Sequence, residues 1–245
     1  MKALLLRFDA PLMAFGDVAV DHHRQTDELP GLAMLTGLLG AALGYQRFDT
    51  DRLQDLQDRL SFSARVDRQG EPLRDYQTVD LGQPSLDGSE ARGIGWTTRG
   101  RMETRGGAEA ATGTHIRLRH FWADRVVTVA LALRRPDAAP RLEELAEALI
   151  RPSFPLYIGR KSCPPAASIL LEVRETPNLR TALVTEPRAE RADTGNLLAE
   201  WPPGEAEGEE IARWDRRDWR NQVHAGSRSA VRGLIDPPGR SGNAL

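Results

Sequence analysis

Two hydrophobic periods alternate along the first 175 residues, and this alternation most limits the folds open to the chain. Short apolar or alternating runs are typical of β-strands, whereas apolar residues at i, i+3, i+4 and i+7 are typical of amphipathic helices. The strand-like runs span residues 2–8, 61–67, 75–81, 125–133 and 168–173, and the helix-like segments span residues 31–44, 50–60 and 140–150. Such an order predicts one α+β domain in which helices cover an antiparallel sheet.

Local signals set the expected ends of these elements. Pro30 and Gly31 open the first helix, Thr50 is expected to cap the second, and Pro152 stops the third. In residues 61–67, apolar residues alternate with polar ones, which predicts a strand with one buried face and one exposed face.

The order strand, helix, strands, strand, helix, strand resembles a ferredoxin-like βαββαβ domain, here residues 1–177. The long stretch between the middle strands is then an inserted hairpin. Residues 178–245 are rich in proline, glycine and charge, and we expect an irregular extension that packs on or beside the same domain. Strand-like patches at residues 210–214 and 219–224 make that extension partly β.

Composition excludes several classes of protein. Of the 245 residues, 40% are hydrophobic and 28% are charged, which is typical of a globular chain. No apolar run approaches the roughly 20 residues of a membrane helix, so we expect no membrane partner. The short apolar N-terminus lacks a signal-peptide pattern and indicates a cytoplasmic protein. The single cysteine, Cys163, excludes an internal disulfide and a cysteine-cluster zinc site, and we expect no metal or other cofactor.

Charge is unevenly distributed behind a net value of -2. Residues 186–210 hold eight acids against two arginines, whereas residues 92–125 hold seven arginines against three acids. That arginine-rich stretch is broken by glycines and interleaved with aromatic residues, a composition that suits contact with a nucleic-acid backbone and its bases. Arginine use in a GC-rich genome, in an ordinary surface loop, explains the same composition without any ligand.

Three glycines give one side of the first predicted helix a stripe without side chains. Gly37, Gly40 and Gly44 lie at i, i+3 and i+7, although glycine costs up to about 1 kcal/mol at a helical position. Either the helix packs tightly on a sheet, which is the commoner use of such a stripe, or a phosphate approaches its backbone.

Residues 157–164 form a second candidate site, with the sequence Tyr-Ile-Gly-Arg-Lys-Ser-Cys-Pro. A glycine followed by two cations and a hydroxyl can make a compact phosphate site. The spacing is not that of a Walker A loop.

Histidines raise the alternative of catalysis. Metal-independent RNA cleavage needs a general base and a cation near the scissile phosphate. His120 with Arg119, and Tyr45 after the glycine-striped helix, could supply these groups. The simpler interpretation is that the histidines contact RNA or solvent.

Five stretches together resemble one family: residues 10–16, 36–47, 73–78, 114–124 and 157–164. In order and spacing they are similar to the subtype I-E branch of the fifth CRISPR-associated (Cas) protein family, whose members are subunits of the Cascade surveillance complex. The resemblance covers roughly residues 1–175, with a weaker echo at Arg217-Asp218-Trp219.

The resemblance implies a non-catalytic subunit with a RAMP-type (RRM-like) ferredoxin-like domain that binds the 5′ handle of CRISPR RNA. It implies crRNA, the Cascade large subunit, the backbone subunits and, through the assembled complex, target DNA as partners. The implied RNA-binding residues are Arg24, Thr36, Gly37, Gly40, Arg47, Arg74, Tyr76, His115, Arg117, Arg119, His120, Tyr157, Gly159, Arg160, Lys161 and Ser162. A thumb-like hairpin at about residues 82–115 is implied to carry Trp96, Arg99, Arg101, Met102 and Arg105.

The chain also departs from the family. Met13 and Phe15 stand where the family usually has glutamine and tryptophan, and the region past residue 177 matches poorly. Another branch of the family processes repeat RNA itself, so a metal-independent endoribonuclease using Tyr45, Arg119 and His120 is the alternative function. A generic basic β-rich interaction module is the third.

Overall fold

A computed structural model describes residues 1–16, 23–80, 94–96, 102–104 and 114–239 of the chain. For residues 78–80, 94–96, 102–104 and 114–116 it describes the backbone alone. The chain divides into two compact units, and each is described by itself. The larger comprises Met1–Val18, Thr26–Pro72 and Trp122–Leu245, and the smaller comprises Ala19–Gln25 and Leu73–Phe121.

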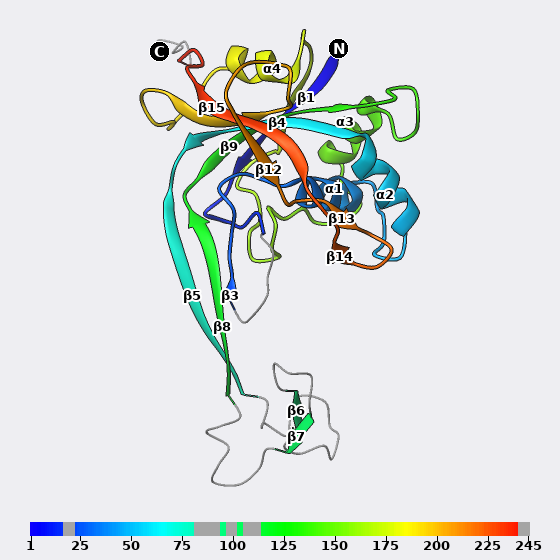
Figure 1. Cartoon of the computed structure of the whole chain (residues 1–245), viewed down its shortest axis with the longest axis vertical. Helices are drawn as coiled ribbons and strands as arrows, with labels where there is room; N and C mark the ends of the chain where they lie inside the picture. The colour runs from blue at the N-terminus through cyan, green and yellow to red at the C-terminus, as the bar shows by residue number, and fades with distance from the viewer. Residues whose placement is uncertain (17–22, 81–93, 97–101, 105–113, 240–245) are drawn as a thin grey trace. The chain divides into compact units, whose positions relative to one another are not determined.

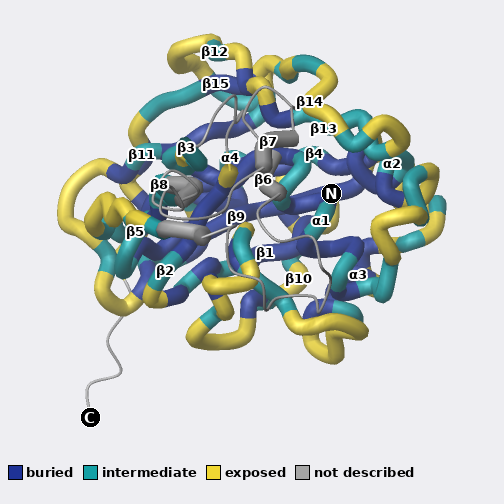
Figure 2. Tube along the Cα trace, turned by 90° about the horizontal axis from the view of Figure 1, so that it is seen from below, coloured by how far each residue is buried: buried dark blue, intermediate teal, exposed yellow. Residues whose placement is uncertain are grey.

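The larger unit is built on a seven-stranded antiparallel sheet with the order β10-β1-β9-β4-β11-β15-β12. Its strands are β1 (Lys2–Asp9), β4 (Leu60–Arg68), β9 (Val126–Leu133), β10 (Leu170–Glu175), β11 (Leu197–Trp201), β12 (Glu209–Arg213) and β15 (Arg228–Ile235). The interior strand β9, which lies between β1 and β4, is buried along its whole length, as its run of β-branched and aliphatic residues predicts (Figure 2). Leu4 pairs with Leu131 in β9 on one side and with Val173 in β10 on the other.

Helices cover both faces of this sheet. They are α1 (Leu32–Ala42), α2 (Thr50–Arg59), α3 (Leu142–Ile150) and α4 (Leu179–Thr185). Figure 1 shows α1 and α3 on one side of the sheet and α4 on the other. The mixed α+β class expected from the sequence is confirmed. Thr50 is not the cap of α2, because Asp49 holds that position and its carboxylate accepts from the Gln46 amide at 2.7 Å.

Strand β4 is buried on both faces, so the expected exposed polar face is wrong. Ser63, Arg65 and Asp67 are all fully buried. They are covered by α4 and the residues after it: the Ser63 hydroxyl donates to the Leu179 carbonyl at 2.9 Å. Arg65 donates to Asp67 at 3.0 Å and to the main-chain carbonyls of residues 183, 186 and 187. The buried Arg65 charge is tolerated because all three guanidinium nitrogens donate hydrogen bonds, to Asp67 and to main-chain carbonyls.

The C-terminal region is more regular than its composition predicts, since it contributes three strands to the main sheet. Several acids of the 186–210 segment form ion pairs and hydrogen bonds within the larger unit. Glu200 is buried and pairs with Arg232 at 2.7 Å and with Arg213 at 3.3 Å. Glu205 accepts from the first amides of α4, at residues 179 and 180, where a carboxylate complements the helix dipole.

The smaller unit contains β3 (His23–Arg24), β6 (Ile94–Trp96) and β7 (Met102–Thr104), and most of β5 (Glu71–Asp80) and β8 (Thr114–Ala123). Strand β8 pairs with β5 and runs parallel to β3, and β6 pairs with β7 (Figure 1). The last residues of β8 belong to the larger unit, where they pair with β2 (Leu12–Met13). Most of the expected thumb, residues 82–115, lies outside the described residues.

Candidate nucleic-acid interface

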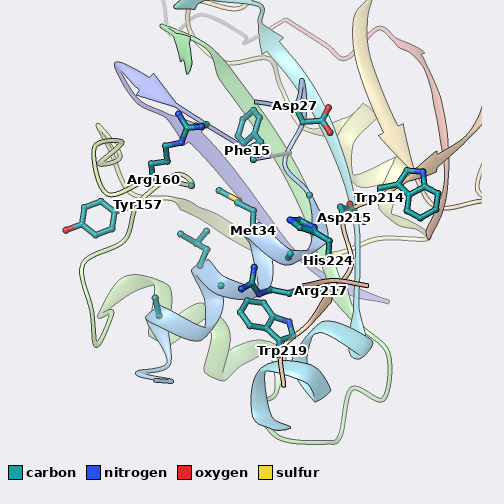
Figure 3. A pocket seen from close by; sticks show the side chains of 18 of the residues that line it. Phe15, Asp27, Met34, Tyr157, Arg160, Trp214, Asp215, Arg217, Trp219 and His224 are labelled. Atoms are coloured by element: carbon teal, nitrogen blue, oxygen red, sulfur yellow. The ribbon is translucent and has the colours of Figure 1, made fainter. Parts of the chain in front are cut away.

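A pocket of about 470 Å³ opens in the larger unit. Its walls come from the segment after β1, the helix α1, the loop after α3, and a C-terminal segment that contains the hairpin β13 (Arg217–Asp218) and β14 (Val223–His224) (Figure 3). The side chains that give it its chemistry are Phe15, Met34, Tyr157, Arg160, Trp214, Arg217, Trp219 and His224.

The loop after α3 is closed on itself and on the segment after β1. The Ile158 amide donates to the Cys163 carbonyl at 2.8 Å, and the Cys163 amide donates to the Arg160 carbonyl at 2.9 Å. The Ala14 amide donates to the Ile158 carbonyl at 3.2 Å. Gly159 has a φ of +91°, and a Cβ placed there would lie 1.6 Å from the Ala14 carbonyl oxygen. The glycine predicted as part of a phosphate site is therefore also the only residue type that fits this close approach.

The hairpin β13–β14 is fixed to α2. Gln57, which is buried, accepts from the Arg217 amide at 3.1 Å and donates to the Arg217 carbonyl at 2.8 Å. Its Oε1 also accepts from the Trp219 indole nitrogen at 3.1 Å. The far edge of that indole lies 3.7 Å from the position of a Cβ on Gly37. The bare surface of α1 thus faces a tryptophan ring that α2 holds in place.

The expected packing of the three glycines on a sheet is wrong. The stripe does not pack on a sheet. A Cβ on Gly40 would lie 2.7 Å from Leu53 of α2, and one on Gly44 would lie 3.0 Å from the Ser153 hydroxyl. Among the three glycines, Gly37 alone lines the pocket.

The N-terminus of α1 takes its cap from the C-terminal region. Gly31 has no side chain to offer, and the Leu32 amide donates to the Asp215 carboxylate at 3.0 Å. Arg228 pairs with the same carboxylate at 2.9 Å. These bonds keep Trp214 and Arg217 beside α1, since they flank the anchored residue in the chain.

The pocket combines aromatic rings with the guanidinium groups of Arg160 and Arg217. Its two acids are already paired, Asp27 with Arg213 at 2.8 Å and Asp215 with Arg228. Burial, followed by the nearby Arg47 guanidinium, lowers the pKa of Arg217. Trp214 is 66% exposed at the rim. Rings on which bases stack, next to guanidinium groups that bind phosphate, are the usual elements of single-stranded nucleic-acid sites.

The structure brings some of the predicted RNA-binding residues together and buries others. Gly37, Tyr157, Gly159 and Arg160 line the pocket, and Lys161 and Ser162 are exposed on the same loop. Thr36 and Gly40 are both buried in the protein. The Thr36 hydroxyl donates to the Leu32 carbonyl at 2.8 Å.

Other predicted residues belong to the smaller unit. Arg24 on β3 is in register with Arg119 on β8, and the rings of His23 and His120 lie 6.3 Å apart. Tyr76 on β5 is 60% exposed. Arg74 and Arg117 also lie on this unit, and only the backbone of His115 is described.

The thumb residues are described only in part. Trp96 and Met102 are paired in register between β6 and β7. Arg99, Arg101 and Arg105 lie outside the described residues.

The three residues of the catalytic alternative are divided between the units. Tyr45 belongs to the larger unit, where its ring lies 3.9 Å from the Arg52 guanidinium carbon. Arg119 and His120 belong to the smaller one. Within the described part of the chain, no cluster of three potential metal ligands occurs, and no helix has the length and apolarity to cross a membrane.

Sequence reasoning missed Met34, Trp214 and His224 as pocket residues. The Arg217-Asp218-Trp219 echo and the strand-like patches around it were the available signals. Neither reveals that the hairpin returns to α1, because the contacts that bring it there join residues about 160 positions apart.

The fold and the pocket define a mixed α+β protein in which a C-terminal hairpin completes a cationic, aromatic site on a glycine-striped helix. The chain belongs to the CRISPR-associated protein family Cas5, whose model matches residues 3–231. The family expected from the sequence motifs is confirmed.

Known proteins give the same relationship. The chain is 32% identical over 189 residues to the CRISPR system Cascade subunit CasD of Escherichia coli (strain K12), and the match covers 74% of this chain and 75% of that protein. A chain of a CRISPR RNA-guided surveillance complex has a similar fold, with a TM-score of 0.70, 24% identity, and coverage of 97% and 95%. A crystal structure of a Cas protein has a TM-score of 0.63, 25% identity, and coverage of 97% and 98%.

Proposed function

We propose that this chain is a non-catalytic, cytoplasmic subunit of a type I-E Cascade complex that binds the 5′ handle of crRNA. In this role it caps the filament of backbone subunits and helps to position the guide and the large subunit for recognition of target DNA. The relationship to a Cascade subunit and the fold shared with a chain of an RNA-guided surveillance complex support the assignment to such a complex.

The convergence of separate motifs on one pocket carries the assignment of the handle site. The segment after β1, the glycine-striped helix, the Gly159–Arg160 loop and the Arg217–Trp219 hairpin are far apart in sequence and line one cavity. Its aromatic rings suit unstacked bases and its arginines suit the connecting phosphates. A single-stranded handle, whose bases are free to stack on protein, fits this chemistry better than a duplex does.

The fold supports the wider assignment. The strands β10-β1-β9-β4, with α1 and α3 on one face, follow the chain order of a ferredoxin-like βαββαβ domain, and we assign residues 1–177 to it and residues 178–245 to an extension. Strands β5 and β8 then lead into a thumb at about residues 82–115. We assign to the thumb, with Trp96, Arg99, Arg101, Met102 and Arg105, the grip on the guide and the contact with the adjoining subunit.

Charge reversal on the exposed loop tests handle binding. The probe is an RNA that carries the 5′ handle, with the sequence taken from the CRISPR repeat that lies next to the gene of this protein. Replacing Arg160 and Lys161 by glutamate should weaken binding of this RNA. Trp219→Ala should also weaken binding, because a stacking surface is removed. A double variant at Arg135 and Arg151, which are 62% and 77% exposed, changes the net charge equally and is the control. Handle affinity that is equal in all variants would contradict the proposal.

Incubation with repeat RNA tests the non-catalytic part. In EDTA, the pure protein should leave the RNA intact. Specific cleavage that is lost in His120→Ala would establish the endoribonuclease alternative, in which Tyr45, Arg119 and His120 act together.

A further inference from the structure

Two arginines from distant parts of the chain share one neutral oxygen. The Arg47 Nε donates to the Gln222 Oε1 at 3.3 Å, and an Arg217 Nη donates to the same oxygen at 3.0 Å. The same Arg217 nitrogen also donates to the Gln222 carbonyl at 3.0 Å. The three residues lie in the larger unit, next to the pocket that Arg217 and Trp219 line.

The other arginines of this region are neutralised. Each of the five others between positions 213 and 232 has a carboxylate partner: Arg213 with Asp27 at 2.8 Å, Arg216 with Asp58 at 2.7 Å, Arg220 with Asp51 at 2.7 Å, Arg228 with Asp215 at 2.9 Å, and Arg232 with Glu200 at 2.7 Å. In the described part of the chain, no carboxylate lies within ion-pair distance of Arg217 or Arg47. A region that pairs its arginines so consistently keeps two positive charges together at one place.

The geometry of this place is held by the hairpin turn. Gln222 has a φ of +60°, which is rare for a residue with a side chain, and its amide nitrogen donates to the Trp219 carbonyl. That bond directs Oε1 toward the two guanidinium groups. Gln57 holds the main chain of Arg217 on both sides. Like charges brought together and a strained turn residue cost stability, and both costs concentrate at functional sites.

We propose that Arg47 and Arg217 form a phosphate site that binds one phosphodiester of the RNA, with the adjacent base in the pocket beside Trp219. This inference rests on the proposed function and adds to it the residues that bind the RNA backbone. The Arg217 guanidinium lies 5.3 Å from the Trp219 ring centre, so the phosphate donors and the stacking surface are within one nucleotide of each other. Burial and the charge of Arg47 lower the pKa of Arg217, and a bound phosphate would offset both effects because it favours the charged guanidinium.

The salt dependence of RNA binding tests the phosphate site. The full chain carrying Arg47→Gln and Arg217→Gln should bind handle RNA roughly tenfold more weakly, and the slope of log K against log salt should fall by about 0.7 for each phosphate that the variant no longer neutralises. The weakening should be equal for the handle RNA and for a scrambled RNA, because a phosphate carries no sequence information. Arg220→Gln, on the same hairpin but paired with Asp51, should leave the slope unchanged.

A second variant separates the site from a role in folding. Gln222→Glu places a carboxylate between the two arginines with almost no change in shape. The variant loses the bond from the Gln222 amide nitrogen to the Trp219 carbonyl but gives the two positive charges a carboxylate partner, so the melting temperature should stay close to that of the unmodified chain. RNA binding should weaken, because the new carboxylate competes with the phosphate. A purely structural role predicts unchanged RNA affinity, and this result would overturn the inference.

The two proposals fail in different ways. If the unmodified chain and its complex do not bind handle RNA, the proposed function fails. If handle binding depends on Arg160, Lys161 and Trp219 while the Arg47, Arg217 and Gln222 variants keep the full salt slope, only the phosphate site fails.

Discussion

Gln57 bonds both main-chain groups of Arg217, donating to its carbonyl at 2.8 Å and accepting from its amide at 3.1 Å. With the bond from the Trp219 indole nitrogen, one buried side chain on α2 holds the hairpin that completes the pocket. Backbone pairing of this kind normally occurs between strands, and here a glutamine amide, whose nitrogen donates and whose oxygen accepts, replaces a neighbouring strand.

Replacing Gln57 by leucine should lower the free energy of unfolding by about 2–4 kcal/mol, because three partly buried polar groups lose their partners. Urea denaturation measures the loss, and hydrogen exchange should accelerate at residues 217–224. Gln54→Leu is the comparison, since its Oε1 accepts only from the Trp219 amide, at 3.2 Å, and its side chain is less buried. Equal losses in the two variants would show that Gln57 is not the main anchor.

Gly159→Ala should be far more damaging than alanine at another glycine with positive φ. The new Cβ would meet the Ala14 carbonyl oxygen at 1.6 Å, whereas around Gly195, with a φ of +80°, nothing lies within 4 Å. Gly195→Ala should cost only the left-handed backbone penalty of about 1–2 kcal/mol. Thermal unfolding compares the two, and handle binding should fall in Gly159→Ala alone. Similar melting temperatures would mean that the loop moves freely away from Ala14.

Asp67→Asn should destabilise the chain by about 3–5 kcal/mol, because it leaves the buried Arg65 guanidinium without its counter-charge. Asp67 also accepts from the Ala189 amide at 3.0 Å and from the Thr128 hydroxyl, so the loss extends to the segment after α4. Glu147→Gln, which breaks an exposed pair with Arg151, should change stability by less than about 0.5 kcal/mol. Chemical denaturation at neutral pH measures both, and an Asp67→Asn cost as small as the control would contradict the buried-pair interpretation.

The buried pair also shows where sequence reasoning on the fold ends. The alternation in residues 61–67 correctly predicts strand β4, but it places Arg65 and Asp67 in solvent, because charged residues are rarely fully buried. Their cover is α4, whose seven residues are too few to show a helical period, together with the Glu186 and Pro187 carbonyls. Strand β15 was missed because arginines and a glycine interrupt its apolar pattern.

Only the part of the pocket formed by α1 and the loop after α3 was predictable from the sequence. Gly37, Gly159 and Arg160 stand in local patterns that themselves suggest a close approach or a phosphate. Trp214 and His224 carry no such pattern, and they reach the pocket through long-range bonds such as those of Asp215 with the start of α1. A single sequence records the residues that make these bonds without recording that they meet.

Cys163 provides a test of loop closure that uses the only thiol of the chain. Burial raises the pKa of the Cys163 thiol, so in the folded protein it stays protonated at a pH where an unfolded thiol ionises. Because the folded pKa is the higher one, folding stability should fall as the pH rises above about 9, where the unfolded chain releases this proton first.

At pH 8, iodoacetamide should modify the native chain far more slowly than the same chain in guanidinium chloride, because the thiolate is the reactive form. In Gly159→Ala, which disrupts the turn between Ile158 and Cys163, native modification should approach the denatured rate. Fast modification of the unmodified native chain would mean that this loop, and the Arg160 side of the pocket with it, opens readily.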